Sequence, residues 1–319
     1  MRVAIYCPFL ASLLLGAVAP ALARRLPPGT ATRLLTAWSV LAAVATSSAL
    51  AVLALTLVGR LPLVAALGHW SPGRLASTSP VPPAVAGIAV VAVALLAVNA
   101  IRVAVLRTRA VLDARALCRG LGAGPGQLVV VDDDVATMAV PVAGGRIVAS
   151  RAQLAALPAP ERRALLLHEG AHLAGRHHLY RLAADLAAAV DPLQSPVRSA
   201  VRYATERWAD EQAAAALGDR AAVARALARE GLRAARTPSR ARWAAVALHG
   251  NGSRVVPRVR ALLAPAPRQR PGLLLATAVL VAFSLLAAVH AQEDTELFFD
   301  RAAAFHTVPA APADVIPGR

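Results

Sequence analysis

The sequence has no lysine, because all 34 of its basic residues are arginine. Mechanisms that need a Ser-x-x-Lys acylation pair, a Schiff-base lysine or a P-loop lysine are therefore excluded. Only two cysteines occur, Cys7 and Cys118, and their wide separation implies neither a disulfide framework nor a cysteine-based zinc site. Charged residues are also scarce, at 16% against 57% hydrophobic residues, which excludes a purely soluble or disordered chain.

Long apolar stretches account for much of this composition. A helix of roughly 20 apolar residues is long enough to cross a bilayer core of about 30 Å, and each stretch has about this length or more. We therefore predict four transmembrane helices, at about residues 3–23, 35–58, 81–106 and 271–290. The first stretch also resembles a cleavable secretory signal, because Arg2 precedes it and Ala21-Leu22-Ala23 ends it. A retained helix is the interpretation that agrees with the distribution of charge.

That distribution orients the chain. Residues 102–270 contain 26 arginines and 13 acidic residues, and arginines flank this segment next to both neighbouring spans. The positive-inside rule therefore predicts that residues 107–270 form a cytoplasmic domain, and that the acidic tail of residues 291–319 lies outside. The arginines are spread along predicted helices without interleaved aromatic residues, so we expect no direct contact with nucleic acid.

Shorter elements follow inside this domain. A helix over residues 107–120 continues from the third span, and glycine-rich breakers end it. Alternating patterns then predict three strands and three helices, the strands at 127–132, 137–142 and 146–150 and the helices at about 161–178, 197–217 and 219–235. We therefore expect an α+β domain between the third and fourth spans of a mainly α membrane protein.

The candidate metal-binding residues are concentrated in the sequence His168-Glu169-Gly170-Ala171-His172. On a helix, residues four apart share one face, so both imidazoles can bind one metal ion while Glu169 projects beside them toward a metal-bound water. The alternative is a helix whose His and Glu side chains are solvated and bind no metal. The surrounding leucines and alanines disfavour it, because polar groups on a largely apolar helix need partners.

Two residues compete to be the third ligand. His178 completes the longer pattern of the metzincins, but these enzymes need a downstream Met-turn, and the only methionines, Met1 and Met138, lie upstream. We favour Glu206, which lies four residues before Asp210 and so shares a helical face with it. Asp210 can then accept a hydrogen bond from a ligand imidazole. Two imidazoles and one carboxylate suit one Zn²⁺ per chain.

The zinc motif, the Glu206-x-x-x-Asp210 helix and the flanking membrane spans resemble the BlaR/MecR-type membrane metallopeptidases of the gluzincin clan, with the HtpX-like family as the second choice. This resemblance implies a cytoplasmic zincin-like metallopeptidase domain in a bacterial plasma membrane, three spans before it and one after. It also implies cleavage of a winged-helix repressor of the BlaI/MecI type. The chain departs from that family because only a short tail replaces the penicillin-binding sensor.

We therefore expect a zinc-dependent endopeptidase in which Glu169 is the general base. The residue that contacts the oxyanion or substrate stays open among His177, His178, Tyr203 and Arg207. By family resemblance, the strand around Arg146–Ala149 would bind an extended substrate along its edge. The alternatives are an HtpX-like quality-control protease and a non-catalytic receptor in which zinc braces the fold. The oligomeric state stays open, and the lipid bilayer is the other expected partner.

Overall fold

The computed structural model describes residues 4–79, 81–120, 128–132, 137–141, 144–236, 255–266 and 268–275, and part of the stretch between residues 277 and 293. The expected fourth span is therefore described only in part, with residues 271–275 and 277–279 helical. The expected tail, apart from Glu293, lies outside the described residues.

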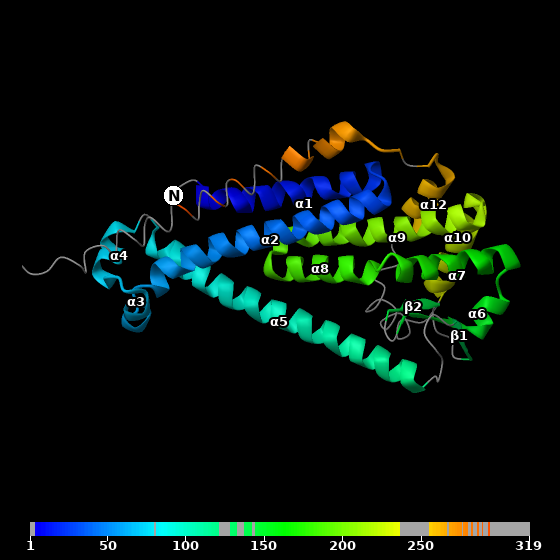
Figure 1. The fold of residues 1–319 in the computed structure, drawn as a ribbon, viewed down its shortest axis with the longest axis horizontal. Helices are drawn as coiled ribbons and strands as arrows, with labels where there is room; N and C mark the ends of the chain where they lie inside the picture. The colour runs from blue at the N-terminus through cyan, green and yellow to red at the C-terminus, as the bar shows by residue number, and fades with distance from the viewer. Residues whose placement is uncertain are drawn as a thin grey trace, which may run out of the picture.

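Helices dominate the described chain, and one small sheet accompanies them (Figure 1). The helices before the sheet are α1 (Cys7–Arg25), α2 (Pro28–Val58), α3 (Pro62–Gly68), α4 (Pro72–Thr78) and α5 (Pro83–Gly120). The strands are β1 (Leu128–Val131), β2 (Met138–Val140) and β3 (Arg146–Ser150). The helices after the sheet are α6 (Arg151–Ala155), α7 (Ala159–Ala174), α8 (His177–Val190), α9 (Ser195–Leu217), α10 (Arg220–Arg236) and α12 (Val255–Leu263), with the short 3₁₀ helix η2 (Pro192–Gln194) joining α8 to α9.

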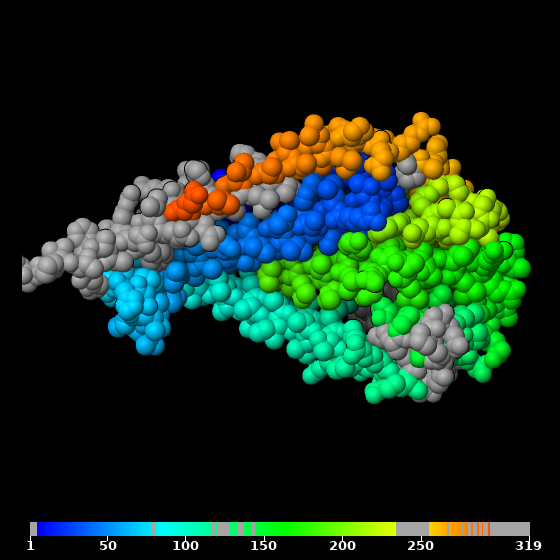
Figure 2. Space-filling view, viewed as in Figure 1, coloured from blue at the N-terminus to red at the C-terminus, as the bar shows by residue number. Residues whose placement is uncertain are grey.

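Three of these helices, α1, α2 and α5, are long and apolar enough to cross a membrane. They coincide with the first three predicted spans, and α5 continues without a break into the helix expected over residues 107–120. In the apolar part of α5, only 11% of the residues are buried. The exposed side chains of this helix include Ile88, Leu95 and Ile101. An apolar surface of this kind suits lipid, and Figure 2 shows α5 along the outside of the molecule.

A four-helix core positions the rest of the molecule. Helices α1, α2, α8 and α9 lie side by side in Figure 1 and share one apolar cluster, which includes Leu15, Leu35, Trp38, Val197 and Val201. Alanine dominates the buried faces of α8 and α9, so these helices approach the spans closely. Helix α9 therefore packs directly against two of the helices that are long enough and apolar enough to cross a membrane.

At one end of this core, α7, α10 and α12 surround the end of α9, and the small sheet lies beside α7. The strand order is β1-β3-β2, with β3 parallel to β1 and antiparallel to β2. The expectation that the strand around Arg146–Ala149 offers a free edge is wrong, because β3 is the central strand and is paired on both sides. The free edge next to α7 belongs to β2.

The predicted single helix over residues 161–178 is also wrong, because the chain turns between α7 and α8. Gly175 lies so close to the next residues that an added Cβ would be 2.3 Å from His177 Nε2. Arg176 follows with φ of 49°, in the left-handed region that ends a helix. The turn places His177 and His178 on a new helix with its own direction.

Helix α1 approaches the α8–α9 connection through Gly16. A Cβ at this position would lie 2.8 Å from the carbonyl oxygen of Leu193, whereas a Cβ on Gly87 in α5 would meet nothing within 4 Å. We therefore expect Gly16→Ala to cost about 1–3 kcal/mol through overpacking. Gly87→Ala should instead gain up to about 1 kcal/mol from helix propensity. Thermal unfolding in detergent compares the two variants, and equal shifts in Tm would contradict this packing.

Candidate metal centre

Three side chains from two helices converge beside the sheet. His168 and His172 lie one turn apart on α7, and their Nε2 atoms are 3.1 Å from each other. Glu206 on α9 places Oε2 3.6 Å from His168 Nε2 and Oε1 3.5 Å from His172 Nε2. The candidate ligand atoms all lie within 4.8 Å of one another. These three residues could hold a metal ion, and they are the set that we favoured from the sequence.

The spacing of this group fits a tetrahedral ion. Two ligand atoms that are each about 2.1 Å from zinc lie roughly 3.4 Å apart at the tetrahedral angle. The two Nε2 atoms are 3.1 Å apart, close to that value, and each of them faces a different oxygen of Glu206, at 3.6 and 3.5 Å. Two imidazoles and a carboxylate are also a donor set that suits zinc, and three protein ligands leave a position for water.

Each imidazole is oriented by a partner on its other nitrogen. His168 Nδ1 is 3.0 Å from Asp210 Oδ1, and His172 Nδ1 is 2.8 Å from His177 Nδ1. Both Nε2 atoms therefore face Glu206, while the Nδ1 atoms face the hydrogen-bond partners that fix the ring orientations. Asp210 has the position that its spacing from Glu206 predicts. His177 contacts the Nδ1 atom of His172, which points away from Glu206, so it does not face the proposed metal position.

Two arginines that the sequence analysis did not identify hold the carboxylates. Arg258 on α12 donates to both oxygens of Asp210, at 2.8 and 2.7 Å, and contacts Glu206 Oε2 at 2.7 Å. Arg181 on α8 donates to Glu206 Oε1. Burial raises the pKa of Glu206 and of Asp210, but Arg258 and the other neighbouring cationic and hydrogen-bonding groups together outweigh burial, so both pKa values are lowered. Both carboxylates are therefore anionic.

Glu169 completes the group from the side of the sheet. Its side chain is buried, and the backbone N–H of Ala139 in β2 donates to Oε2 at 2.7 Å. Burial raises the pKa of this carboxyl to about 7. Burial also lowers the pKa of His168, but the hydrogen bonds with Asp210 and Glu206 more than compensate and raise it to about 9. A bound metal would replace that proton, because imidazole ligates in its neutral form.

The other candidates lie elsewhere. His178 is exposed on α8 and does not belong to the group. Arg207 donates to the carbonyl oxygens of Ala23 and Arg24 at 2.9 and 3.2 Å, and its guanidinium lies 5.9 Å from the centre of the Tyr203 ring. Tyr203 and Arg207 therefore join α9 to α1, and the structure brings neither of them to the His168 group.

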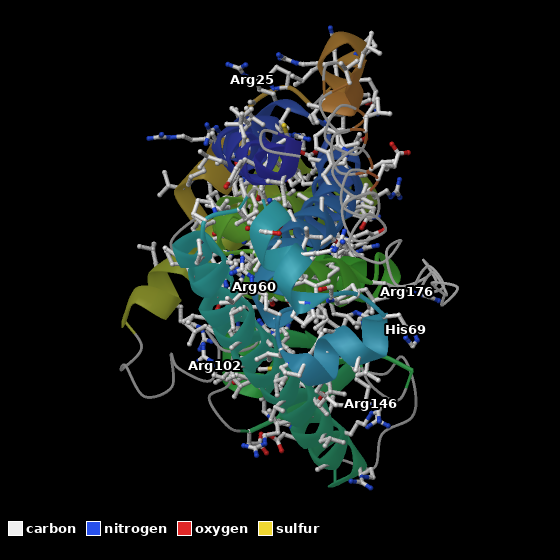
Figure 3. The ribbon with its side chains drawn as sticks, turned by 90° about the vertical axis from the view of Figure 1, so that its left-hand side faces the viewer. Arg25, Arg60, His69, Arg102, Arg146 and Arg176 are labelled. Carbon is white, nitrogen blue, oxygen red and sulfur yellow. The ribbon has the colours of Figure 1, made fainter. Side chains whose placement is uncertain are left out.

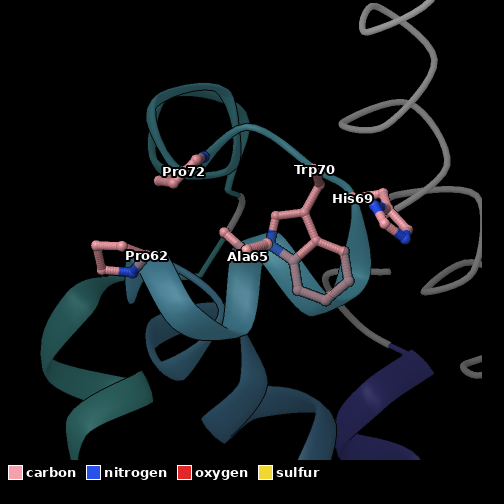
Figure 4. Close-up of a pocket in the computed structure, with 6 residues that line it drawn as sticks. Pro62, Ala65, His69, Trp70 and Pro72 are labelled. Atoms are coloured by element: carbon pink, nitrogen blue, oxygen red, sulfur yellow. The ribbon is translucent and has the colours of Figure 1, made fainter.

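A pocket at the opposite end of the molecule has different chemistry. It lies between α3 and α4 and is lined by Pro62, Ala65, Ala66, His69, Trp70 and Pro72 (Figure 4). Seen from that end, α3 and α4 lie in front of the bundle and His69 is at the near side (Figure 3). Trp70 Nε1 donates to the Gly59 carbonyl at 2.9 Å, which fixes the indole as part of the local fold. The pocket holds a single titratable side chain and no carboxylate.

Comparison of the chain with known protein families, with curated proteins and with solved structures finds no match. The resemblance of residues 168–210 and their flanking spans to a membrane metallopeptidase family therefore stands as an expectation. Any function has to be inferred from the chemistry of the described side chains.

Zinc content tests the ligand set. We expect about one zinc per purified chain, lost in His172→Ala and in Glu206→Gln, because each change removes one of three protein ligands. Gln at position 206 has one acceptor oxygen, so it keeps only one of the contacts with Arg181 and Arg258, whereas His172→Ala removes a ligand without removing either contact. His178→Ala is the matched control and should retain zinc. Elemental analysis after dialysis measures all four proteins, and loss of zinc in His178→Ala alone would contradict this assignment.

Stability tests the role of Arg258. Arg258→Leu leaves the buried carboxylate of Asp210 and the half-buried carboxylate of Glu206 with less compensation, and removing one partner of a buried pair costs about 3–5 kcal/mol. Arg260→Leu changes an exposed arginine two residues later on α12 and should cost less than about 0.5 kcal/mol. Chemical unfolding with a metal chelator present measures the difference without help from bound metal. Similar losses in both variants would show that Arg258 does not carry this charge compensation.

Proposed function

We propose that this protein is an integral membrane, zinc-dependent endopeptidase. The observation that carries the proposal is the position of Glu169, a buried carboxylate adjacent in sequence to His168 and held by the Ala139 amide. A structural zinc site needs no general base and closes its fourth position with another ligand. A carboxylate beside three ligands therefore supports catalysis.

The roles of the side chains follow from their contacts. Zinc bound by His168, His172 and Glu206 supplies a Lewis acid that activates water and polarises the peptide carbonyl. Glu169 Oε2 accepts the Ala139 N–H, so we assign proton transfer to Oε1, which takes a proton from the attacking water and returns it to the leaving amine. Asp210 and His177 keep the two imidazoles oriented.

An extended substrate would add to β2. This strand is the edge of the sheet that faces α7, and the pairing of Met138 with Val148 and Val140 with Arg146 joins its other side to β3. A peptide laid along this edge would run next to Glu169 and would compete with that side chain for the Ala139 N–H.

The sequence supports a cellular setting for this activity. The three apolar helices suggest membrane insertion, and the arginines that flank residues 107–270 favour a cytoplasmic location for the metal group. The resemblance to the BlaR/MecR-type family implies a bacterial plasma membrane. By resemblance, the proposed substrate is a winged-helix repressor of the BlaI/MecI type. Membrane-protein quality control of the HtpX kind is the alternative activity, and a zinc-braced receptor without catalysis is the other alternative.

Glu169→Gln separates these possibilities. The variant keeps a side chain of the same shape that can accept the Ala139 N–H, but it removes the general base, so we expect zinc to be retained and peptide hydrolysis to fall by about 10²–10⁴-fold. Mass spectrometry of new protein N-termini in cells expressing wild type or Glu169→Gln detects cleavage of any cellular protein, so the substrate need not be chosen in advance. Asp113→Asn, an exposed change on α5, serves as the control.

New termini that require Glu169 in a soluble repressor would support regulatory proteolysis. Such termini in membrane proteins would support quality control. Identical termini in wild type and Glu169→Gln, with zinc present in both, would contradict the peptidase proposal and favour the receptor.

A further inference from the structure

Helices α8 and α9 form a hairpin that runs lengthwise among the membrane helices. At its tip, Ser12 Oγ in α1 donates to Asp191 Oδ2 at 2.6 Å, and Thr46 in α2 donates to the same oxygen at 3.0 Å. Farther along α9, Arg207 reaches the end of α1 at Ala23. The hairpin tip therefore lies beside the middle of α1 and α2, whereas the metal group lies near their ends.

Charged residues on three helices lie at the same height along the bundle. Asp185 on α8 is buried and accepts hydrogen bonds from Arg107 on α5 and Arg202 on α9. Arg107 follows the last apolar residues of α5, and the exposed Arg102 lies five residues before it, so this level is at or beyond the point where that span meets water. At about 1.5 Å per residue, Asp191 lies roughly 9 Å beyond Asp185 toward the interior of the spans. Arg198 lies one turn beyond Arg202, within the reach of a long side chain that extends back to the boundary.

Between that level and the tip, the hairpin has little that needs water. Residues 186–190 are Leu-Ala-Ala-Ala-Val, and the carbonyl of Ala189 accepts a hydrogen bond from Asn99 on α5 at 2.9 Å. The exposed side chains at the tip are apolar and belong to Pro192, Leu193 and Pro196. The polar Asp191 and Gln194 are buried.

The backbone of the tip is closed as well. Pro192 and Pro196 have no N–H, and the N–H of Leu193 donates to Asp191 Oδ1 at 3.1 Å. The N–H of Gln194 donates to the Asp191 carbonyl, and the N–H of Ser195 donates to the Pro192 carbonyl. Every backbone donor from residue 192 to residue 196 is therefore absent or satisfied within the turn. A turn exposed to hydrocarbon must satisfy its backbone donors within the protein, whereas a turn exposed to water can leave them to the solvent.

We propose that α8 and α9 form a re-entrant hairpin whose tip, Asp191–Pro196, contacts the hydrocarbon interior of the bilayer. The hairpin enters the bilayer from the side on which the metal group lies, and it returns to the same side without crossing the bilayer. Its membrane partner is lipid, on the outer side of Pro192, Leu193 and Pro196, while Ser12 and Thr46 hold Asp191 on the inner side. This proposal concerns topology, so it does not depend on peptidase activity.

A single fluorophore tests the location of the tip. In a background of Cys7→Ser and Cys118→Ser, Leu193→Cys carries a bimane label, and Ser195→Cys gives a second, nearly isosteric position. Leu232→Cys on α10 is the control, because Leu232 is 62% exposed on a helix whose main contacts are with α7, α9 and α12. The full-length proteins are reconstituted into vesicles that contain either plain lipid or lipid with nitroxide groups on its acyl chains.

Lipid nitroxides should quench the label at residues 193 and 195, and iodide on both sides of the membrane should quench it on the order of tenfold less than at residue 232. Iodide quenching at residues 193 and 195 as strong as at residue 232 would overturn the proposal. Quenching by neither agent would also overturn it, because protein, including a second copy of this chain, would then cover the tip.

Discussion

One half-buried and one buried carboxylate, four residues apart on α9, constrain the end of the molecule that holds the candidate metal centre. Glu206 and Asp210 are too costly to bury unpaired, so each is surrounded by groups from other helices. His168 comes from α7, Arg181 from α8 and Arg258 from α12. Compensating these charges therefore fixes the positions of three helices around α9, and a divalent ion between the imidazoles and Glu206 would add positive charge at the same point.

The opposite face of α9 packs against two of the helices that are long and apolar enough to cross a membrane. Along that face, Val197 and Val201 pack with α1 and α2, and Arg207 caps the carbonyl end of α1. Glu206 lies only four residues from Arg202, about 6 Å along the helix axis, so the proposed topology puts the centre close to the membrane boundary. A polypeptide that reaches Glu169 would do so near the membrane surface. The charge pair between Arg107 and Asp185 also ties the third span directly to the hairpin that carries His177 and Arg181.

The parts of this arrangement that the sequence predicted depend on local periodicity. Residues four apart on a helix share a face, so the two histidines and the Glu206–Asp210 pair could be grouped from spacing alone, and the three spans followed from length and apolarity. Arg258 could not be identified, because it is one of 34 arginines and its contacts lie 48 residues away in sequence. The turn at Gly175 and the central position of β3 were also missed. A close approach to His177 and the order of strands are properties of the tertiary structure that no local pattern encodes.

X-ray absorption spectroscopy at the zinc edge, on the full chain loaded with one equivalent of zinc, tests the central claim that this centre holds zinc through two imidazoles and one carboxylate. The account predicts a shell of nitrogen and oxygen atoms at about 2.0–2.1 Å with outer-shell scattering from two imidazole rings and no sulfur. Scattering from three imidazoles would make His178 or His177 a ligand and contradict the Glu206 assignment. A shell of oxygen alone would show that the ion binds elsewhere.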